Sequence, residues 1–200
     1  QNQTLFDIAV NPAVYAGEIE NAFREIAETA AKTLDVKRAA IWLYDEKYTY
    51  IKCLSLYDRN AAQHSDGKQI HVKEYPAYFK ALATGRVIAA HNAQIDPATS
   101  EFLIDYLIPN GISSILAAPI RSGGHYIGVI CHEHTGNPRE WTPDEQQFAV
   151  SMADMVSLVY ETNARQKAQQ ALLESEERFR ILSESSNSAI FAFRKKILYA

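Results

Sequence analysis

The most chemically reactive run in this sequence is Cys131-His132-Glu133-His134. It lies in a β-rich segment, where side chains alternate between faces, so His132 and His134 would share one face and Cys131 and Glu133 the other. Two histidines on one face can bind a metal ion, but a closed site needs a third and a fourth ligand, and none is suitably spaced. We therefore predict no metal site, and we expect a strand end that enters solvent, with Cys131 in the core.

The two cysteines, Cys53 and Cys131, both fall in apparent strands. This placement indicates buried thiols in a reducing compartment rather than a disulfide framework. No nucleophile elbow, phosphate-binding loop or metalloprotease helix occurs in the sequence. We therefore expect a chain that is not itself an enzyme and that resides in the cytoplasm.

Length and charge restrict the function further. The 200 residues allow one domain together with a linker or part of a second domain. The net charge of −4 and the lack of a basic cluster argue against a nucleic-acid partner, and no apolar run approaches the length of a membrane span. Because the sequence begins without methionine and ends in an apparent strand, we interpret it as an internal fragment of a longer protein.

Hydrophobic periodicity and turn residues predict the elements of the first half of the chain. They are a helix that begins at Asn11-Pro12, strands at 38–44 and 48–56, a loop at 58–68, a helix at 76–83, a short central strand at 86–90 and a helix at 96–107.

The second half is predicted to form a hairpin and then a long helix. Strands at 112–120 and 125–134 flank a glycine turn, and Thr142-Pro143-Asp144-Glu145 carries a capping box with proline at the first helical position. The whole pattern predicts an α+β fold, an antiparallel sheet with helices on it.

The last helix continues well beyond the needs of one domain. Past residue 161 it is mostly polar, with a weak heptad-like spacing of Ala168, Leu172, Phe179 and Leu182. A long polar helix usually needs a partner, so we expect a two-stranded connector that makes the protein a homodimer. The alternative is a solvated helix that frays.

Several of these motifs together resemble a GAF domain, a regulatory module of bacterial sensor proteins, over residues 12–161. The resemblance implies an antiparallel sheet with the terminal helices on one face, and with short helices and loops over a small-molecule pocket on the other. Its residues are Tyr75-Pro76-Ala77-Tyr78-Phe79, Ala83-Thr84-Gly85-Arg86-Val87-Ile88, Tyr106-Leu107, Gly111-Ile112, Ser114, Leu116, Pro119-Ile120, Gly128-Val129 and Trp141-Thr142-Pro143-Asp144-Glu145.

The end of the chain resembles the opening of a PAS domain, through residues 175–182, 189–191 and 197–200. The expected organisation is therefore an N-terminal segment at 1–11, a GAF domain at 12–161, a coiled-coil-like signalling helix at 162–182 and a truncated PAS start at 183–200. Such arrays usually precede an output domain in the same chain, either a histidine kinase or a cyclic-dinucleotide enzyme.

The GAF resemblance also suggests ligands, and two of them do not fit. In phytochromes a cysteine attaches the bilin through a thioether and a histidine follows it; these positions would fall on Phe102 and Leu103, so no covalent bilin is expected. The Asn-Lys…Phe…Asp-Glu signature of cyclic-nucleotide-binding domains is broken, because Pro138 replaces the lysine and Trp141 the phenylalanine.

The middle of the chain holds the side chains that could line a pocket, with Tyr106 and His91 as the expected polar contacts. The same aromatic residues could equally be core filling. The sequence thus predicts a sensory module, with a ligand-free structural dimerisation spacer as the alternative. The candidate ligand-binding residues are Tyr57, Tyr75, Phe79, His91, Phe102, Tyr106 and Ser114.

Overall fold

Two β-hairpins form the centre of the fold, as the sequence predicts. In the computed structural model, β1 (Arg38–Tyr44) pairs with β2 (Tyr50–Asp58), and β6 (Ile112–Ser122) pairs with β7 (His125–Thr135). β1 also pairs antiparallel with β7, which joins the hairpins into one sheet. The structure describes residues 19–84 and 87–198, with side chains described as far as residue 183.

Three short strands complete the sheet and correct two expectations. β3 (Gln63–Ser65) and β4 (Gln69–His71) pair with β2, so residues 58–68 are not simply a loop. β5 (Ile88–Ala90) pairs only with β6 in the order β3-β2-β1-β7-β6-β5, so it is an edge strand rather than a central one. The expected α+β fold with an antiparallel sheet is confirmed.

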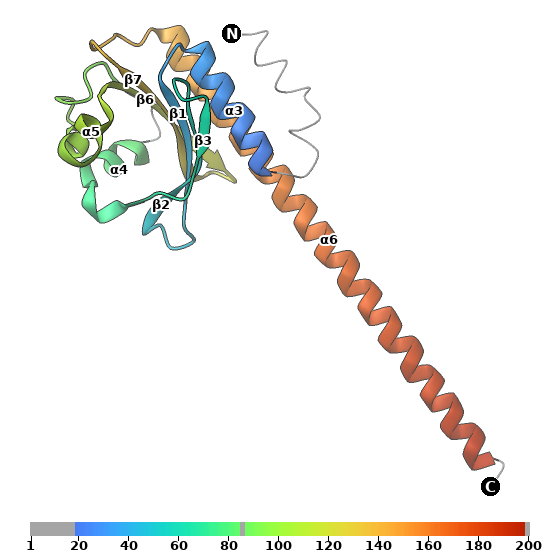
Figure 1. Cartoon of the computed structure of the whole chain (residues 1–200). Helices are drawn as coiled ribbons and strands as arrows, with labels where there is room; N and C mark the ends of the chain where they lie inside the picture. The colour runs from blue at the N-terminus through green and yellow to red at the C-terminus, as the bar shows by residue number, and fades with distance from the viewer. Residues whose placement is uncertain (1–18, 85–86, 199–200) are drawn as a thin grey trace. The chain divides into compact units, whose positions relative to one another are not determined.

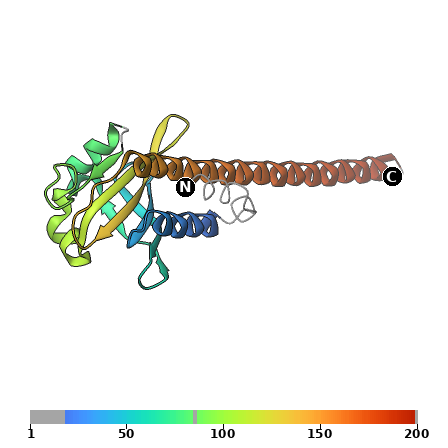
Figure 2. The same cartoon turned by 90° about the horizontal axis from the view of Figure 1, so that it is seen from above.

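One face of the sheet is covered by α3 (Ile19–Thr33) and by the first part of α6 (Pro143–Leu198), as Figures 1 and 2 show. Their apolar stripes bury one continuous core against the alternate residues of the strands. This core includes Phe23, Ile26, Ile41, Ile130, Phe148 and Met152. The expected helix start at Asn11-Pro12 lies outside the described residues.

The opposite face is covered by short helical segments, namely η1 (Val72–Glu74), α4 (Pro76–Ala83), η2 (Ser100–Phe102), η3 (Leu103–Leu107) and α5 (Ile108–Asn110). The continuous helix expected at 96–107 is wrong at its start. Asp96 accepts a hydrogen bond from the Ala98 amide, and Thr99 donates one to the Ala93 carbonyl, which holds a turn there. Helical structure begins at Ser100, includes a turn of π-helix in η3, and ends at Gly111 in the left-handed conformation.

α6 begins with the predicted capping box. The Thr142 amide donates to Glu145 and the Glu145 amide donates to the Thr142 hydroxyl, with Pro143 as the first helical residue. Residues 162–200 form a compact unit of their own. The strand expected at the end of the sequence, residues 196–200, is wrong as far as Leu198, because α6 runs to that residue and the sequence has no glycine or proline between 162 and 198 to end it. Residues 199–200 lie outside the described residues.

Gly128 allows β1 and β7 to approach closely near the end of their pairing. A Cβ atom at this position would lie 2.0 Å from the Trp42 carbonyl oxygen and 2.6 Å from Leu43 Cδ2. The backbone oxygen cannot move without disturbing β1, so only glycine fits. Gly123, in the β6–β7 turn, differs because it has a φ of 57° and nothing within 4 Å of the position of its Cβ.

These two glycines give a matched test of the packing between β1 and β7. We expect Gly128→Ala to lower the free energy of unfolding by about 3 kcal/mol, because the methyl group overpacks the sheet. Gly123→Ala should cost about 1 kcal/mol through its backbone conformation alone. Urea unfolding monitored by circular dichroism measures both values, and equal losses would contradict the close approach.

Candidate functional site

A buried cluster of polar side chains lies at one end of the sheet, on the face that α4 and α5 cover. Arg38 and Glu133 are direct register partners in β1 and β7. Arg38 Nε donates to Glu133 Oε2 at 2.7 Å, and Arg38 Nη2 lies 2.7 Å from the same oxygen. Tyr106 Oη donates to Glu133 Oε1 at 2.6 Å, and Arg38 Nη1 donates to Asn110 Oδ1 at 2.8 Å. The sheet thus binds one carboxylate oxygen and η3 binds the other.

The cluster is almost completely removed from water, since Arg38 is 9% and Glu133 2% exposed. Burial lowers the pKa of Arg38, but the Glu133 carboxylate and Tyr106 raise this pKa by more, so the guanidinium stays charged. Burial, followed by the Glu133 carboxylate, holds the pKa of Tyr106 well above its ordinary value, so its hydroxyl remains a donor. A buried ion pair adds little net stability, because the attraction has to offset the desolvation of both charges.

Next to the cluster is a small cavity between the sheet and the short helices. Its volume is about 20 Å³, and its walls include Trp42, Tyr78, Phe102, Tyr106 and Glu133. A cavity of this size holds about one water molecule. The side chains of the domain itself therefore fill the space under α4 and η3.

Stacked aromatic rings keep this cavity small. Tyr75 stacks on Phe102 with 4.0 Å between the ring centroids, and Tyr78 meets Phe102 edge-on at 4.9 Å. The Tyr78 hydroxyl also lies 3.3 Å from Cys131 Sγ. Any enlargement of the cavity would have to displace these rings.

On the other side of the cluster the surface opens into a basin of about 370 Å³. Arg38, Asp58, Asp66, Lys68 and Asn110 line it, and Tyr106 lines both the basin and the cavity. Lys68 Nζ lies 4.4 Å from the centroid of the Tyr106 ring, within range of a cation–π interaction. The buried cluster thus lies between a large, charged basin and a small, apolar cavity.

The structure brings together only some of the candidate residues from the sequence. Phe102 and Tyr106 line the cavity, and Tyr75 stacks on Phe102 from outside the lining. Phe79 lies beside the lining residue Tyr78, with 5.4 Å between their ring centroids. The other three candidates are elsewhere: Tyr57, His91 and Ser114.

The fold explains why Tyr57, Ser114 and His91 do not line the cavity. Tyr57 belongs to the core under α3 and packs at a tilt against His64, with 4.8 Å between the ring centroids. Ser114 and Leu116 alternate with the cavity residue Ile115 along β6, so Ser114 lies on the α3–α6 face. His91 follows the edge strand β5 and bonds to the segment before α6.

The sequence did not identify Arg38, Glu133 and Lys68 as site residues. Glu133 was correctly placed on the same strand face as Cys131, but the expected entry of this strand end into solvent is wrong, because His132 and Glu133 are both buried. The useful signal was an arginine opening one strand and a glutamate near the end of another. These two residues indicate an ion pair only once β1 is known to pair with β7, which places them opposite each other.

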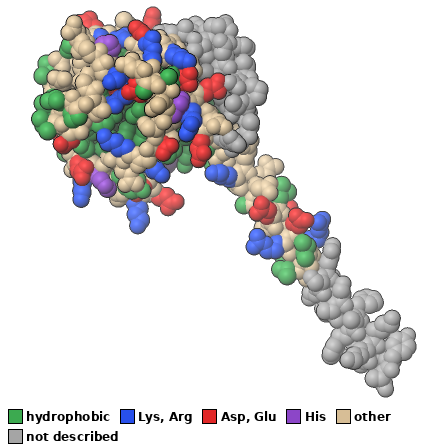
Figure 3. Space-filling model, viewed as in Figure 1, with side chains coloured by type: hydrophobic (Ala, Val, Ile, Leu, Met, Phe, Trp, Pro, Cys, Tyr) green, Lys and Arg blue, Asp and Glu red, His purple; other side chains and the backbone are tan. Residues whose placement is uncertain are grey.

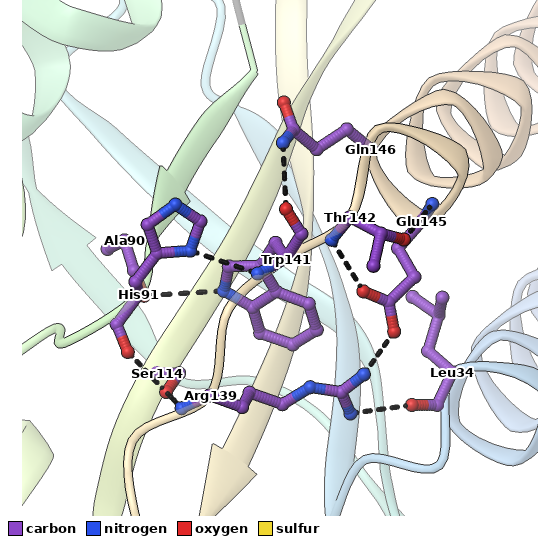
Figure 4. A network of polar contacts seen from close by, with 9 residues as sticks. All are labelled: Leu34, Ala90, His91, Ser114, Arg139, Trp141, Thr142, Glu145 and Gln146. Carbon is purple, nitrogen blue, oxygen red and sulfur yellow. Dashed lines mark hydrogen bonds and ion pairs between the residues drawn. The ribbon is translucent and has the colours of Figure 1, made fainter.

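A second polar network links the edge of the sheet to the start of α6 (Figure 4). The Arg139 amide donates to Ser114 Oγ at 2.9 Å, and Arg139 Nη1 donates to the Leu34 carbonyl at 3.0 Å. Arg139 also pairs with Glu145 and lies 4.6 Å from the Trp141 ring. This arginine therefore ties together the end of the α3 region, β6 and the first turn of α6.

His132 is fully buried on the α3–α6 face, between Ala39 and Leu116 on the neighbouring strands. Its Nδ1 atom donates to the Leu116 carbonyl at 2.9 Å, while its Nε2 atom has no hydrogen-bond partner in the described part of the chain. Burial lowers the pKa of His132 from 6.5 to about 4, so the ring is neutral in the folded protein.

The arrangement of the sheet and the helices on its two faces is that of an α+β domain. The chain belongs to the GAF family, because the model of the GAF domain matches residues 18–160. A search of curated protein sequences gives no match to this chain.

Solved structures show the same fold at low sequence identity. The phycoerythrobilin-bound GAF domain of a cyanobacterial phytochrome has a TM-score of 0.68 at 15% identity, covering 83% of this chain and 97% of that one. Residues 122 to 287 of a methyl-accepting chemotaxis protein have a TM-score of 0.66 at 17% identity, and the match covers 83% of this chain and 99% of that one. The GAF domain of an Acinetobacter phosphoenolpyruvate-protein phosphotransferase has a TM-score of 0.62 at 14% identity, and the match covers 84% of this chain and 92% of that one.

The described residues contain neither a metal-binding group nor a membrane span. Within residues 19–84 and 87–198, no group of three or more His, Cys, Asp or Glu side chains could hold a metal ion. No helix in these ranges is long and apolar enough to cross a membrane. Figure 3 shows acidic and basic side chains interspersed over the visible face of the domain.

The pH dependence of folding tests the burial of His132. Since its pKa is about 4 in the folded protein and 6.5 ordinarily, its neutral form contributes full stability above pH 6.5, and this is lost as the pH falls towards 4. At pH 5 the loss should be about 2 kcal/mol. Urea unfolding at pH 7.5 and 5.0 measures the free energy of unfolding at each pH. The difference between these two values should be smaller for His132→Gln than for the wild type. The exposed control His125→Gln should match the wild type, and an identical difference in all three would contradict the burial.

The thiols give a prediction about chromophores. Burial raises the pKa of Cys53 and of Cys131 to about 12, so neither thiol ionises readily, and Phe102 holds the position expected for an attachment cysteine. After incubation with phycocyanobilin, we expect no coloured band on a denaturing gel and no added mass. A covalent adduct would contradict this description of the thiols.

Proposed function

We propose that this chain is the sensory module of a cytoplasmic signal-transduction protein, and that its GAF domain binds a small molecule. The observation that carries the proposal is the Arg38–Glu133–Tyr106 cluster, buried between the cavity and the basin. An apolar packing of the same volume would serve folding as well as an ion pair. The charges therefore support a role in recognition.

The basin has the size and the chemistry for a small polar ligand. Its volume of about 370 Å³ falls in the usual range for small-molecule sites. Lys68 and Arg38 provide positive charge, Asp58 and Asp66 provide negative charge, and Asn110 provides an amide. A small molecule with both donors and acceptors fits this lining better than an apolar one.

Ligand binding would reach α6 through the segment that carries Tyr106. A ligand that engages Arg38 competes with Asn110 and Glu133 for the guanidinium, and both of these are bonded to the η3–α5 segment. That segment leads through Gly111 into β6, where Ser114 bonds to Arg139 before α6. We propose that α6 carries the resulting change to an output domain in the same chain, a histidine kinase or a cyclic-dinucleotide enzyme.

A ligand-free dimerisation spacer is the second candidate function. The observation in its favour is the small cavity of about 20 Å³, which is lined by the packed rings of Tyr78 and Phe102. A domain filled in this way by its own side chains would hold two output domains in register without responding to a ligand.

A ligand screen separates these two functions. Thermal unfolding with a panel of amino acids, carboxylic acids and nucleotides should identify at least one compound that raises the midpoint of the wild type. Lys68→Met should weaken the apparent affinity for that compound, derived from the midpoint shift, by at least about tenfold, because it removes a charge-assisted contact in the basin. The control Lys47→Met, in the exposed β1–β2 turn, should behave as the wild type. A panel without effect on the wild type would favour the spacer.

We also propose that the part of α6 beyond residue 161 pairs with a second copy of the chain. Leu172 and Phe179 lie seven residues apart and are 59% and 75% exposed, and apolar side chains are visible along this part of the helix in Figure 3. A heptad repeat of apolar side chains is the pattern of a two-stranded coiled coil.

Light scattering tests the pairing directly. The wild type should have about twice the chain mass of 22.5 kDa, and Leu172→Glu combined with Phe179→Glu should have the mass of one chain, because two charges would face each other in the seam. Gln166→Glu is the control on the same helix and should remain dimeric. A monomeric wild type at high concentration, with α6 still helical, would contradict the proposal.

A further inference from the structure

His91 makes an unusual contact at the edge of the sheet. Its Nδ1 atom accepts a hydrogen bond of 2.9 Å from the backbone amide of Trp141, the residue directly before the capping box of α6 (Figure 4). Its carbonyl oxygen accepts a second bond of 2.7 Å from Ser114 Oγ. His91 thus joins the segment after β5 to the start of α6 with its side chain, and to β6 with its backbone.

The side-chain contact depends on the protonation of the ring. A nitrogen atom accepts a hydrogen bond from an amide only when it carries no proton, so His91 must be neutral and protonated at Nε2. Histidine is the side chain whose charge ordinarily changes between about pH 5 and 8. His91 is exposed, so protons reach it from solvent without unfolding.

We propose that the His91–Trp141 contact is a proton-operated latch, which holds the residues before α6 against the edge of the sheet. The latch is closed while Nδ1 carries no proton, and protonation of Nδ1 replaces the acceptor with a second donor that faces the Trp141 amide. The contact is therefore lost as the pH falls. This regulation needs no small molecule and acts directly on the start of the signalling helix.

Other contacts hold Trp141 while the latch is open. Trp141 Nε1 donates to the Ala90 carbonyl at 3.3 Å, and Gln146 Nε2 donates to the Trp141 carbonyl at 3.1 Å. Trp141 itself is only 3% exposed. Protonation would therefore loosen the first turn of α6 without releasing the indole ring from its site.

Any test by pH must distinguish the effect of His91 from the effects of charged groups on the surrounding elements. They are Asp96 in the turn after β5, His134 at the end of β7, Arg139 and Glu140 in the loop before α6, and Asp144 and Glu145 in its first turn. His134 is the other histidine of this group, and burial followed by the Arg139 charge lowers its pKa. It is the natural control.

Amide exchange in the whole chain, followed by NMR, tests the latch. After correction for the intrinsic pH dependence of exchange, the protection of the Trp141 amide should fall roughly three- to tenfold between pH 7.5 and 5.0. His91→Asn places a non-titrating oxygen near the position of Nδ1, so its protection should stay high at both pH values. In His91→Ala the Trp141 amide should have low protection at both pH values. In the control His134→Asn the protection of this amide should fall between pH 7.5 and 5.0 as much as in the wild type.

Three results would overturn the latch: unchanged wild-type protection, a fall of equal size in His91→Asn, or loss of the fall in His134→Asn. A measurement on the wild type alone tests the latch even if the variants fail to fold. The ¹⁵N chemical shift of His91 Nδ1 and the amide shift of Trp141 should titrate with one common midpoint. Separate midpoints would also overturn the proposal.

Discussion

The ion pair between Arg38 and Glu133 connects the parts of this domain that are far apart in sequence. It bridges β1 and β7, the two strands whose pairing makes one sheet from two local hairpins. Because both charges are buried, each needs further partners, and these are Tyr106 and Asn110 in the segment that covers the sheet. The same interaction therefore links the two central strands to η3 and α5.

The two faces of the sheet have different physical characters. The face under α3 and α6 is packed with aliphatic and aromatic side chains, and His132 is a neutral buried group within it. The other face combines stacked aromatic rings with the charged cluster and opens into the basin. Ser114, Arg139 and Trp141 connect the edge of the sheet to the first turn of α6. This division supports the proposal made above, in which one face receives a signal and the other holds the helix that transmits it.

The features that local sequence controls were predictable, and those that depend on distant pairing were not. Both hairpins and the Thr142–Glu145 capping box follow from turn residues and spacing within a few positions. The β1–β7 pairing joins residues 95 positions apart, so nothing nearby in the sequence shows that Glu133 faces Arg38. The alternation that would have excluded Ser114 from the cavity also depended on this pairing, because it decides which face the helices cover. The helix at 96–107 failed for a local reason, since side chains of Asp96 and Thr99 compete for backbone groups.

The central claim is that the buried ion pair serves recognition more than folding, and a combined replacement tests it most directly. Arg38→Met with Glu133→Leu removes both charges while keeping a similar volume, and Tyr106→Phe in the same variant removes the hydroxyl that would otherwise lose its acceptor. If the claim is correct, the free energy of unfolding of this variant stays within about 1 kcal/mol of the wild type or rises, and the thermal shift caused by basin ligands disappears. A loss of several kcal/mol, with the ligand response retained, would show that the pair is a structural device and would contradict the account.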